Sequence, residues 1–131
     1  MRDPLMPSIP ALVENHFPSG KLESRWTEVD GKKAGLLQRW TESGALFSEI
    51  EYMDGLPNGE IRQWTEAGAL TLLATVSRGE FNGPYKSWWN VGQLKEEGVF
   101  ANGKRVGRYV WYREDGSVWH SEVFPGTDQD L

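Results

Sequence analysis

The sequence predicts an all-β protein: an elongated, open, single-layer twisted sheet that runs as an antiparallel β-meander of 24-residue hairpin repeats. Three observations lead to this fold class. Thirteen of the fifteen glycines recur at a fixed step of 24 residues, large apolar residues recur at the same step, and polar and apolar residues alternate between the glycines. Alternation with a period of two is typical of a half-exposed strand, and a fixed step is typical of a repeat architecture.

The repeat glycines fall into three series without insertion or deletion. They are Gly20, Gly44, Gly68, Gly92 and Gly116; Gly31, Gly55, Gly79 and Gly103; and Gly35, Gly59, Gly83 and Gly107. Large residues keep the same spacing. Four positions before the first series stand His16, Trp40, Trp64, Trp88 and Tyr112; two positions after it stand Leu22, Leu46, Leu70, Leu94 and Val118; eight after it stand Glu28, Tyr52, Val76, Phe100 and Phe124. The first unit departs from the last of these patterns, since Glu28 occupies the apolar position.

One unit reads as two strands and two turns. Residues 45–53, "ALFSEIEYM", alternate as a strand does, and "DGLPNG" that follows is a turn by composition. The segment "EIRQW" is then a second short strand, and "TESG" or "TEAG" turns the chain again. Glycine at the end of that turn suits a type I turn followed by a left-handed residue. The whole chain therefore predicts about ten strands, which at about 4.8 Å between neighbours make a sheet roughly 45–50 Å long.

Simple alternation predicts two different faces. One is a continuous apolar ladder of Leu22, Trp26, Trp40, Leu46, Ile50, Tyr52, Trp64, Leu70, Val76, Trp88, Leu94, Phe100 and Tyr112. The other mixes charged residues with Leu37, Phe47, Ile61, Leu73, Tyr85, Trp89, Tyr109, Trp111 and Trp119. Twist can curl the first face into a core, which would leave the second face to solvent or to a partner.

Length and composition place the chain among ordinary folded proteins of one domain. It has 131 residues, a net charge of −5 and no cysteine. The acidic balance disfavours binding to nucleic acid or to an anionic membrane, and the lack of cysteine excludes disulfides and thiolate metal sites. No apolar run reaches the roughly 18 residues of a membrane-spanning helix, and the N-terminus lacks the features of a signal peptide. We expect a cytoplasmic protein without membrane insertion.

The domain organisation follows from the limits of the repeat. Residues 1–15 are predicted to be an extended arm, residues 16–124 the repeat domain, and residues 125–131 an acidic flexible tail. Pro4, Pro7 and Pro10 are spaced by three, as on one ridge of a polyproline II helix, so the arm either packs on the first hairpin or presents a proline-rich ligand motif.

The repeat resembles that of the MORN-repeat proteins. The best match is "FANGKRVGRYVWYREDG" at residues 100–116, with an aromatic residue, Asn-Gly, a basic pair, Gly, an aromatic residue and a closing Gly. The 24-residue step and the Gly-x-Leu after each turn resemble the variant in YwqK-type antitoxins. The resemblance spans roughly residues 16 to 124. It implies an elongated single-layer sheet and a protein that neutralises a partner toxin.

No residue pattern predicts catalysis, a cofactor or a metal site. His16 and His120 are far apart, and no triad or metal-ligand spacing surrounds them. Glu49 and Glu51 point the same way along one strand, but nothing in the other units completes an acid–base site, so a solvated strand face is the simpler interpretation. We therefore expect a protein that is not an enzyme. The recurrence of the turn acids Glu42, Glu66 and Glu114 is explained first by turn chemistry; as a row along one edge they are also a candidate contact for a basic partner.

The candidate site is an aromatic patch on the second face. Alternate residues on neighbouring strands share a face, so a patch is predicted from Tyr85, Trp89, Tyr109, Trp111 and Trp119, with Phe47, Glu49 and Glu51 as further candidate contacts. Such patches make hot spots in protein interfaces. Burial under a terminal segment or in a dimer, and sugar binding, remain open alternatives. The sequence thus predicts an antitoxin or immunity protein that blocks a partner protein; the alternative functions are a self-associating scaffold and a lipid- or glycan-binding module.

Overall fold

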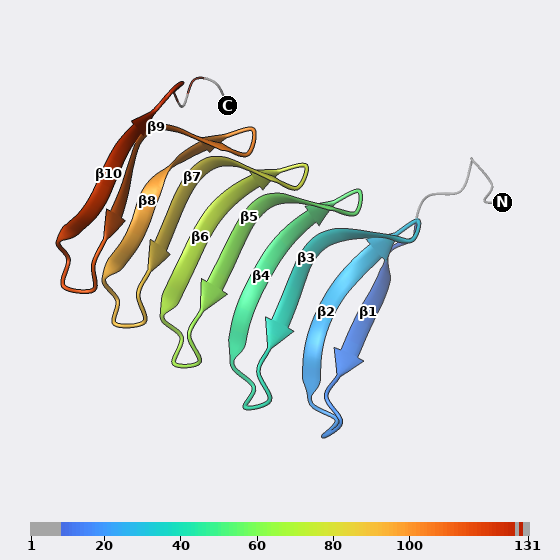
Figure 1. Cartoon of the computed structure of the whole chain (residues 1–131). Coiled ribbons are helices and arrows are strands. Elements are labelled where there is room, and N and C mark those ends of the chain that lie inside the picture. The colour runs from blue at the N-terminus through green and yellow to red at the C-terminus, as the bar shows by residue number, and fades with distance from the viewer. Residues whose placement is uncertain (1–8, 128, 130–131) are drawn as a thin grey trace.

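Ten antiparallel strands form one open sheet whose order follows the chain (Figure 1). The computed structural model describes residues 9–127 and 129. The outer strands β1 and β10 do not pair with each other, so the sheet is not closed. This confirms the predicted all-β meander. The strands are β1 (Ala11–His16), β2 (Leu22–Val29), β3 (Lys32–Trp40), β4 (Leu46–Met53), β5 (Leu56–Trp64), β6 (Leu70–Ser77), β7 (Glu80–Trp88), β8 (Leu94–Ala101), β9 (Lys104–Tyr112) and β10 (Val118–Phe124).

The two edges of the sheet carry two kinds of turn. At the broad-turn edge, glycines of the first series close five-residue connections: the Gly44 N–H donates to the Thr41 carbonyl (3.0 Å), and Gly44 has φ of 94°. This agrees with the predicted type I turn followed by a left-handed residue. At the tight-turn edge, two residues with positive φ connect the strands, as at Asp54 (51°) and Gly55 (83°). Two positive φ values define the type I′ hairpin turn, whose twist matches that of the strands.

The tight turn is shorter than composition predicts. Only Asp54 and Gly55 of "DGLPNG" form the turn, because β5 already begins at Leu56. Pro57 pairs with Tyr52 inside the sheet, next to a shift of register. Proline has no N–H to give to the ladder, and an irregular position of this kind is where a strand can hold it. The predicted strand "EIRQW" is therefore the second half of a nine-residue strand.

The third glycine series bends the strands. Gly35, Gly59, Gly83 and Gly107 lie inside the odd strands with φ between 65° and 123°, and the pairing shifts opposite them. Extra residues in one strand bend it, and glycine accepts the backbone angles required. The bend has a direction: the Arg105 guanidinium carbon lies 5.3 Å from the Trp111 ring centroid. Six residues of straight strand span roughly 20 Å, so β9 must fold toward this face. The sheet is a trough, and this face is concave (Figure 1).

The predicted division of the two faces is wrong in half of each unit, and a β-bulge is the reason. Trp40 pairs with Leu46, but the preceding Arg39 pairs with Ser48, which leaves Phe47 as an extra residue. The same shift recurs after each broad turn. One extra residue reverses which face the following residues occupy. Leu46 and Ile50, predicted together, therefore point to opposite sides.

The concave face carries the main core. Ile50 pairs with Leu37 on one side and Ile61 on the other, so these share a face although they were predicted apart. Continuing this row across the sheet brings in Ala74, Tyr85, Gly98 and Tyr109. Leu37, Ala74 and Tyr109 expose 2%, 1% and 0% of their surface. The repeat tryptophans Trp40, Trp64 and Trp88 lie on the convex face, where the Arg25 guanidinium packs 5.3 Å from the Trp40 ring.

The repeats are joined at the tight-turn edge by hydrogen bonds from each turn to the hairpin before it. The Gly79 N–H donates to the Pro57 carbonyl (2.8 Å), and the Arg78 N–H donates to Asn58 Oδ1 (3.0 Å). Gly103 and Asn102 repeat this pattern one unit later. Each hairpin is thus held by its neighbours, as expected of a quasi-one-dimensional protein.

The predicted domain limits differ from the structure at the N-terminal side. β1 begins at Ala11 and pairs with β2 along its whole length, so the sheet includes residues predicted to belong to the arm. Pro4 and Pro7 lie outside the described residues. Across residues 9–127 and 129, no helix has the length and hydropathy needed to cross a membrane.

Candidate partner-binding site

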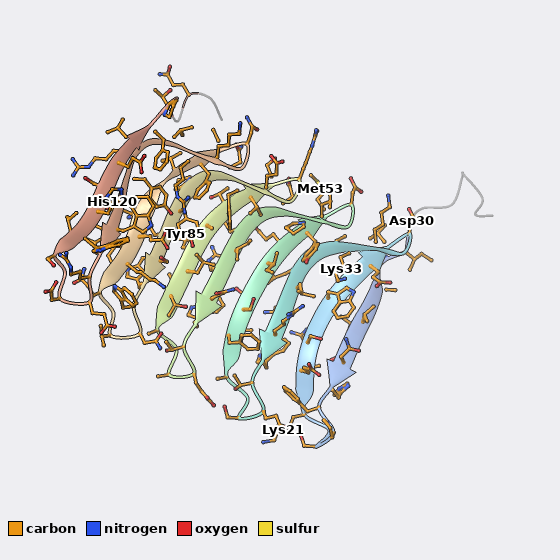
Figure 2. All side chains as sticks on the ribbon, viewed as in Figure 1. Lys21, Asp30, Lys33, Met53, Tyr85 and His120 are labelled. Atoms are coloured by element: carbon orange, nitrogen blue, oxygen red, sulfur yellow. The ribbon has the colours of Figure 1, made fainter. Side chains whose placement is uncertain are left out.

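An aromatic cluster fills the concave face at the C-terminal end of the sheet (Figure 2). Its ring centroids lie 4.7–6.4 Å apart, within the range in which aromatic pairs attract. The strands bring it together because every second residue of β7 to β10 points to this face. The aromatic cluster consists of Phe81, Tyr85, Phe100, Tyr109, Trp111 and Phe124.

Arg105 covers the centre of the aromatic cluster. Its guanidinium carbon lies 4.7 Å from the Tyr109 centroid and 5.4 Å from that of Phe100, which are cation–π distances. Its Nη2 is 3.9 Å from Glu96 Oε1, which also accepts a hydrogen bond from the Tyr109 hydroxyl (3.1 Å). Burial, and then the nearby Glu96 carboxylate, raise the pKa of Tyr109 above its ordinary range. Arg105 remains partly exposed above the cluster, whereas Tyr109 beneath it has no exposed surface.

A glycine outside the three series makes room for Tyr109. Gly98 sits beside Tyr109 in the concave row, and a Cβ built on Gly98 would lie 2.1 Å from Tyr109 Cδ2. The same position one unit earlier holds Ala74, beside Tyr85. The tyrosine ring of β9 therefore lies directly over bare backbone of β8, and this explains why Gly98 departs from the 24-residue step.

Three tryptophans meet around one open hollow of about 380 Å³ at the broad-turn edge. Trp89 comes from the β7–β8 turn, Trp111 from β9 and Trp119 from β10. The Trp89 indole Nε1 donates to the Tyr112 carbonyl (3.3 Å), and Lys95 Nζ lies 4.6 Å from the Trp89 ring. We call this site the tryptophan hollow; its lining is Trp89, Lys95, Trp111, Tyr112, Arg113, Glu114 and Trp119.

The exposed wall of the tryptophan hollow is Trp119. This side chain exposes 64% of its surface, whereas Trp89 and Trp111 are half-buried. Trp119 is the extra residue of the bulge in β10, between Val118, which pairs with Tyr112, and His120, which pairs with Trp111. The bulge thus turns an additional large side chain toward the hollow.

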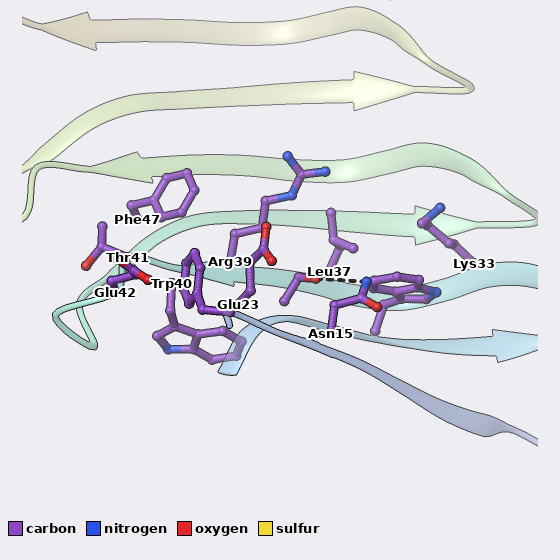
Figure 3. A pocket seen from close by; sticks show the side chains of 12 residues that line it. Asn15, Glu23, Lys33, Leu37, Arg39, Trp40, Thr41, Glu42 and Phe47 are labelled. Atoms are coloured by element: carbon purple, nitrogen blue, oxygen red, sulfur yellow. Dashed lines mark hydrogen bonds between the residues drawn. The ribbon is translucent and has the colours of Figure 1, made fainter. Parts of the chain in front are cut away.

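The same hollow recurs 72 residues earlier with different chemistry (Figure 3). There Phe47 takes the place of Trp119, Arg39 that of Trp111, and Glu23 that of Lys95. The shape therefore belongs to the repeat, and both hollows have aromatic residues in their lining, but of the two only the C-terminal one is lined by three tryptophans. This is the difference that singles out the tryptophan hollow as a candidate binding site.

The structure separates the predicted site residues into three groups. Trp89, Trp111 and Trp119 converge as predicted. Tyr85 and Tyr109 lie in the aromatic cluster instead, and Tyr109 is fully buried and cannot touch a partner. Phe47 lies in the earlier hollow, on β4.

Glu49 and Glu51 share a face, as predicted, but it is the convex one. Glu49 Oε2 accepts a hydrogen bond from Gln38 Nε2 (2.8 Å), and Glu51 accepts one from the Glu60 N–H. These contacts agree with the interpretation of Glu49 and Glu51 as an ordinary strand face.

Lys95 and Arg113 line the tryptophan hollow but were not predicted as site residues, although alternation places Lys95 on the face of the predicted patch. Lys95 is the bulge residue of β8, and Arg113 is the first residue of the last broad turn. Comparing units at the 24-residue step could have found both, since Lys95 aligns with Phe47 and Trp119, and Arg113 aligns with Trp89.

The two histidines do not form a site with other ligating residues. His120 lies 5.3 Å from the Trp111 ring centroid and 3.4 Å from Glu122 Oε2, while His16 lies at the far end of the sheet in β1. In the part of the chain that the structure describes, no three His, Asp or Glu side chains gather closely enough to hold a metal ion.

Fold and site together define a class: an open β-repeat protein with an aromatic hollow at one end of its sheet. No known family model and no curated protein matches this chain.

Proposed function

We propose that this chain is a non-catalytic binding protein that captures a partner protein through the tryptophan hollow. The convergence of Trp89, Trp111 and Trp119 on one apolar hollow is the observation that carries the proposal. Tryptophan is the residue most enriched at the energetic centres of interfaces, because it buries a large rigid surface at a low entropic cost. Trp119 is accessible to a partner, since 64% of its surface is exposed.

The charges beside the hollow favour a partner with a mixed surface. Lys95 and Arg113 stand on its rim with Glu114, so a partner needs an apolar side chain for the hollow and an acidic group beside it. The net charge of −5 favours a basic partner over longer distances.

The class of partner rests on the repeat pattern. The 24-residue step and the unit at residues 100–116 resemble MORN-type repeats of YwqK-type antitoxins. We therefore propose that the partner is a toxin and that the chain neutralises it in the cytoplasm as an antitoxin or immunity protein.

The test compares Trp119→Ala with Val91→Ala. Val91 is also exposed (71%) and lies in the β7–β8 turn outside the lining of the hollow, so it is a matched control. The toxin-like product of a neighbouring gene is co-expressed with each variant, and its affinity is measured by calorimetry. Trp119→Ala should weaken binding by about 2 kcal/mol and abolish growth rescue, while Val91→Ala should do neither. Equal rescue by both variants would move the site elsewhere, and no complex with the parent protein would refute the proposal.

Trp111→Ala is a second and less selective probe. The Trp111 ring packs 4.7 Å from Tyr109 and 5.3 Å from Arg105, so its removal also opens the aromatic cluster. We expect both the affinity for the partner and the melting temperature to fall. Added oligosaccharide should leave the tryptophan fluorescence unchanged; quenching would favour glycan binding instead.

A further inference from the structure

The two outer strands, β1 and β10, expose large apolar side chains to solvent, because each lacks a neighbouring strand on one side in the part of the chain that the structure describes. Five of the nine exposed large hydrophobic residues lie in or beside β1 and β10: Ile9 (77%), Leu12 (63%), Val118 (48%), Trp119 (64%) and Val123 (77%). Within residues 9–127 and 129, each of these strands pairs with one neighbour. The outer edges of both strands therefore offer backbone N–H and C=O groups for a further strand.

We propose that a second copy of this chain docks there, its β1 pairing with β10 as an eleventh strand. The register follows from the interfaces already present. Three successive hairpins pair Ser48 with Gln63, Leu72 with Ser87, and Glu96 with Trp111, each pair 24 residues after the last. One further step of 24 gives the positions 120 and 135. Position 135 corresponds to Asn15 of the second copy, because it lies five steps of 24 after residue 15. A second copy of β1 thus continues the repeat without changing its geometry.

This register pairs compatible side chains. His120 lies opposite Asn15 of the second copy, Ser121 opposite its Glu14, and Glu122 opposite its Val13. No pair brings two like charges together.

The apolar residues are matched as well. The same step that pairs Val76 with Phe81 and Phe100 with Arg105 places Phe124 opposite Ile9 of the second copy. Val123 then lies next to this pair and faces the Pro10–Leu12 segment of the second copy. Exposed apolar surface on each edge is therefore covered by apolar surface of the other.

The contact joins different surfaces of the two copies, so it does not close. Such heterologous pairing adds copies in a row and leaves one β1 and one β10 open at the ends. A single strand pair buries less than the roughly 1,200 Å² of a stable interface, so the association should be weak and depend on concentration.

The test blocks each outer strand, β1 or β10, separately. Val123→Lys places a charge on β10, and Leu12→Lys places one on β1; both positions are exposed, so the fold should persist. Sedimentation velocity over a concentration series should show growing oligomers for the parent protein. Each variant alone should stay monomeric at concentrations at which the parent associates, with its dissociation constant raised about tenfold or more.

Mixing the two blocked variants separates head-to-tail pairing from other modes. Each variant keeps one intact edge, so the mixture should form a one-to-one heterodimer and nothing larger. Val91→Lys, exposed but in the β7–β8 turn and thus outside both outer strands, should associate as the parent does. A monomeric parent, a Leu12→Lys variant that still dimerises through β10, or a mixture without heterodimer would overturn the proposal.

Discussion

Replacing Gly98 by alanine tests the packing of the buried tyrosine directly. The added Cβ would lie 2.1 Å from Tyr109 Cδ2, 2.7 Å from Cε2 and 2.8 Å from Cγ, where about 3.5 Å is needed. The ring cannot simply swing away. Tyr109 exposes none of its surface and is packed by Trp111 on one side and Phe100 on another, with ring centroids 4.7 and 5.8 Å away.

Two opposing terms set the size of the effect. Overpacking a filled site usually costs about 1–3 kcal/mol. Gly98 does not have a positive φ, so its backbone accepts alanine, and the lower entropy of the unfolded chain returns about 0.4–1 kcal/mol. The net loss in the free energy of unfolding should be about 1–2 kcal/mol, which lowers the melting temperature by roughly 3–10 °C in a chain of this size.

The assay is urea unfolding followed by tryptophan fluorescence, with a double-mutant cycle as the control. If the clash with the tyrosine ring is the cause, Gly98→Ala should cost at least about 1 kcal/mol less in a Tyr109→Leu background than in the parent. An alanine variant as stable as the parent, or an equal loss in both backgrounds, would refute the reasoning.

The remaining predictions concern the turns, the bends and the buried tyrosine. Arg78→Asn should raise the free energy of unfolding by about 0.5–1 kcal/mol, because Arg78 has φ of 51° and asparagine tolerates this left-handed region better than arginine does. Thermal unfolding measures the change, and no gain in stability would show that Arg78 makes a compensating contact. Gly83→Ala should lower the free energy of unfolding by about 1 kcal/mol more than Gly79→Ala does. Both glycines have positive φ, but only at Gly83 does the new Cβ approach Thr75, at 3.0 Å. Equal losses of stability in urea unfolding would count against this close approach. For Tyr109, the raised pKa means that the folded state holds the phenol proton after the unfolded state has lost it, so stability is unaffected below about pH 10 and falls as the pH rises beyond it. The tyrosinate absorbance that a Tyr109→Phe variant lacks should therefore appear at a higher pH in the folded protein than in urea, and its appearance at the same pH in both states would contradict this.

The candidate site was only partly predictable from the sequence. The surplus of aromatic residues in the C-terminal units is visible directly, and Trp89, Trp111 and Trp119 do meet. Which aromatic residues are buried was not visible, because Tyr109 and Trp111 are both large, apolar and two residues apart on one strand. Burial depends on what lies across the strand: Tyr109 packs over Gly98, whereas Trp111 borders the open hollow.

The sequence by itself determined the architecture. Glycine is the residue that best accepts the left-handed backbone of the turns and bends, and its recurrence every 24 residues fixes the number, order and direction of the strands. Only the tertiary structure decided which side each strand presents. One bulge residue per unit, such as Phe47, reverses the alternation, and a bulge leaves no mark in the apolar pattern because it is defined by the pairing with the neighbouring strand. The core therefore joins Leu37 with Ile50 on the concave face, and the repeat tryptophans lie on the convex one.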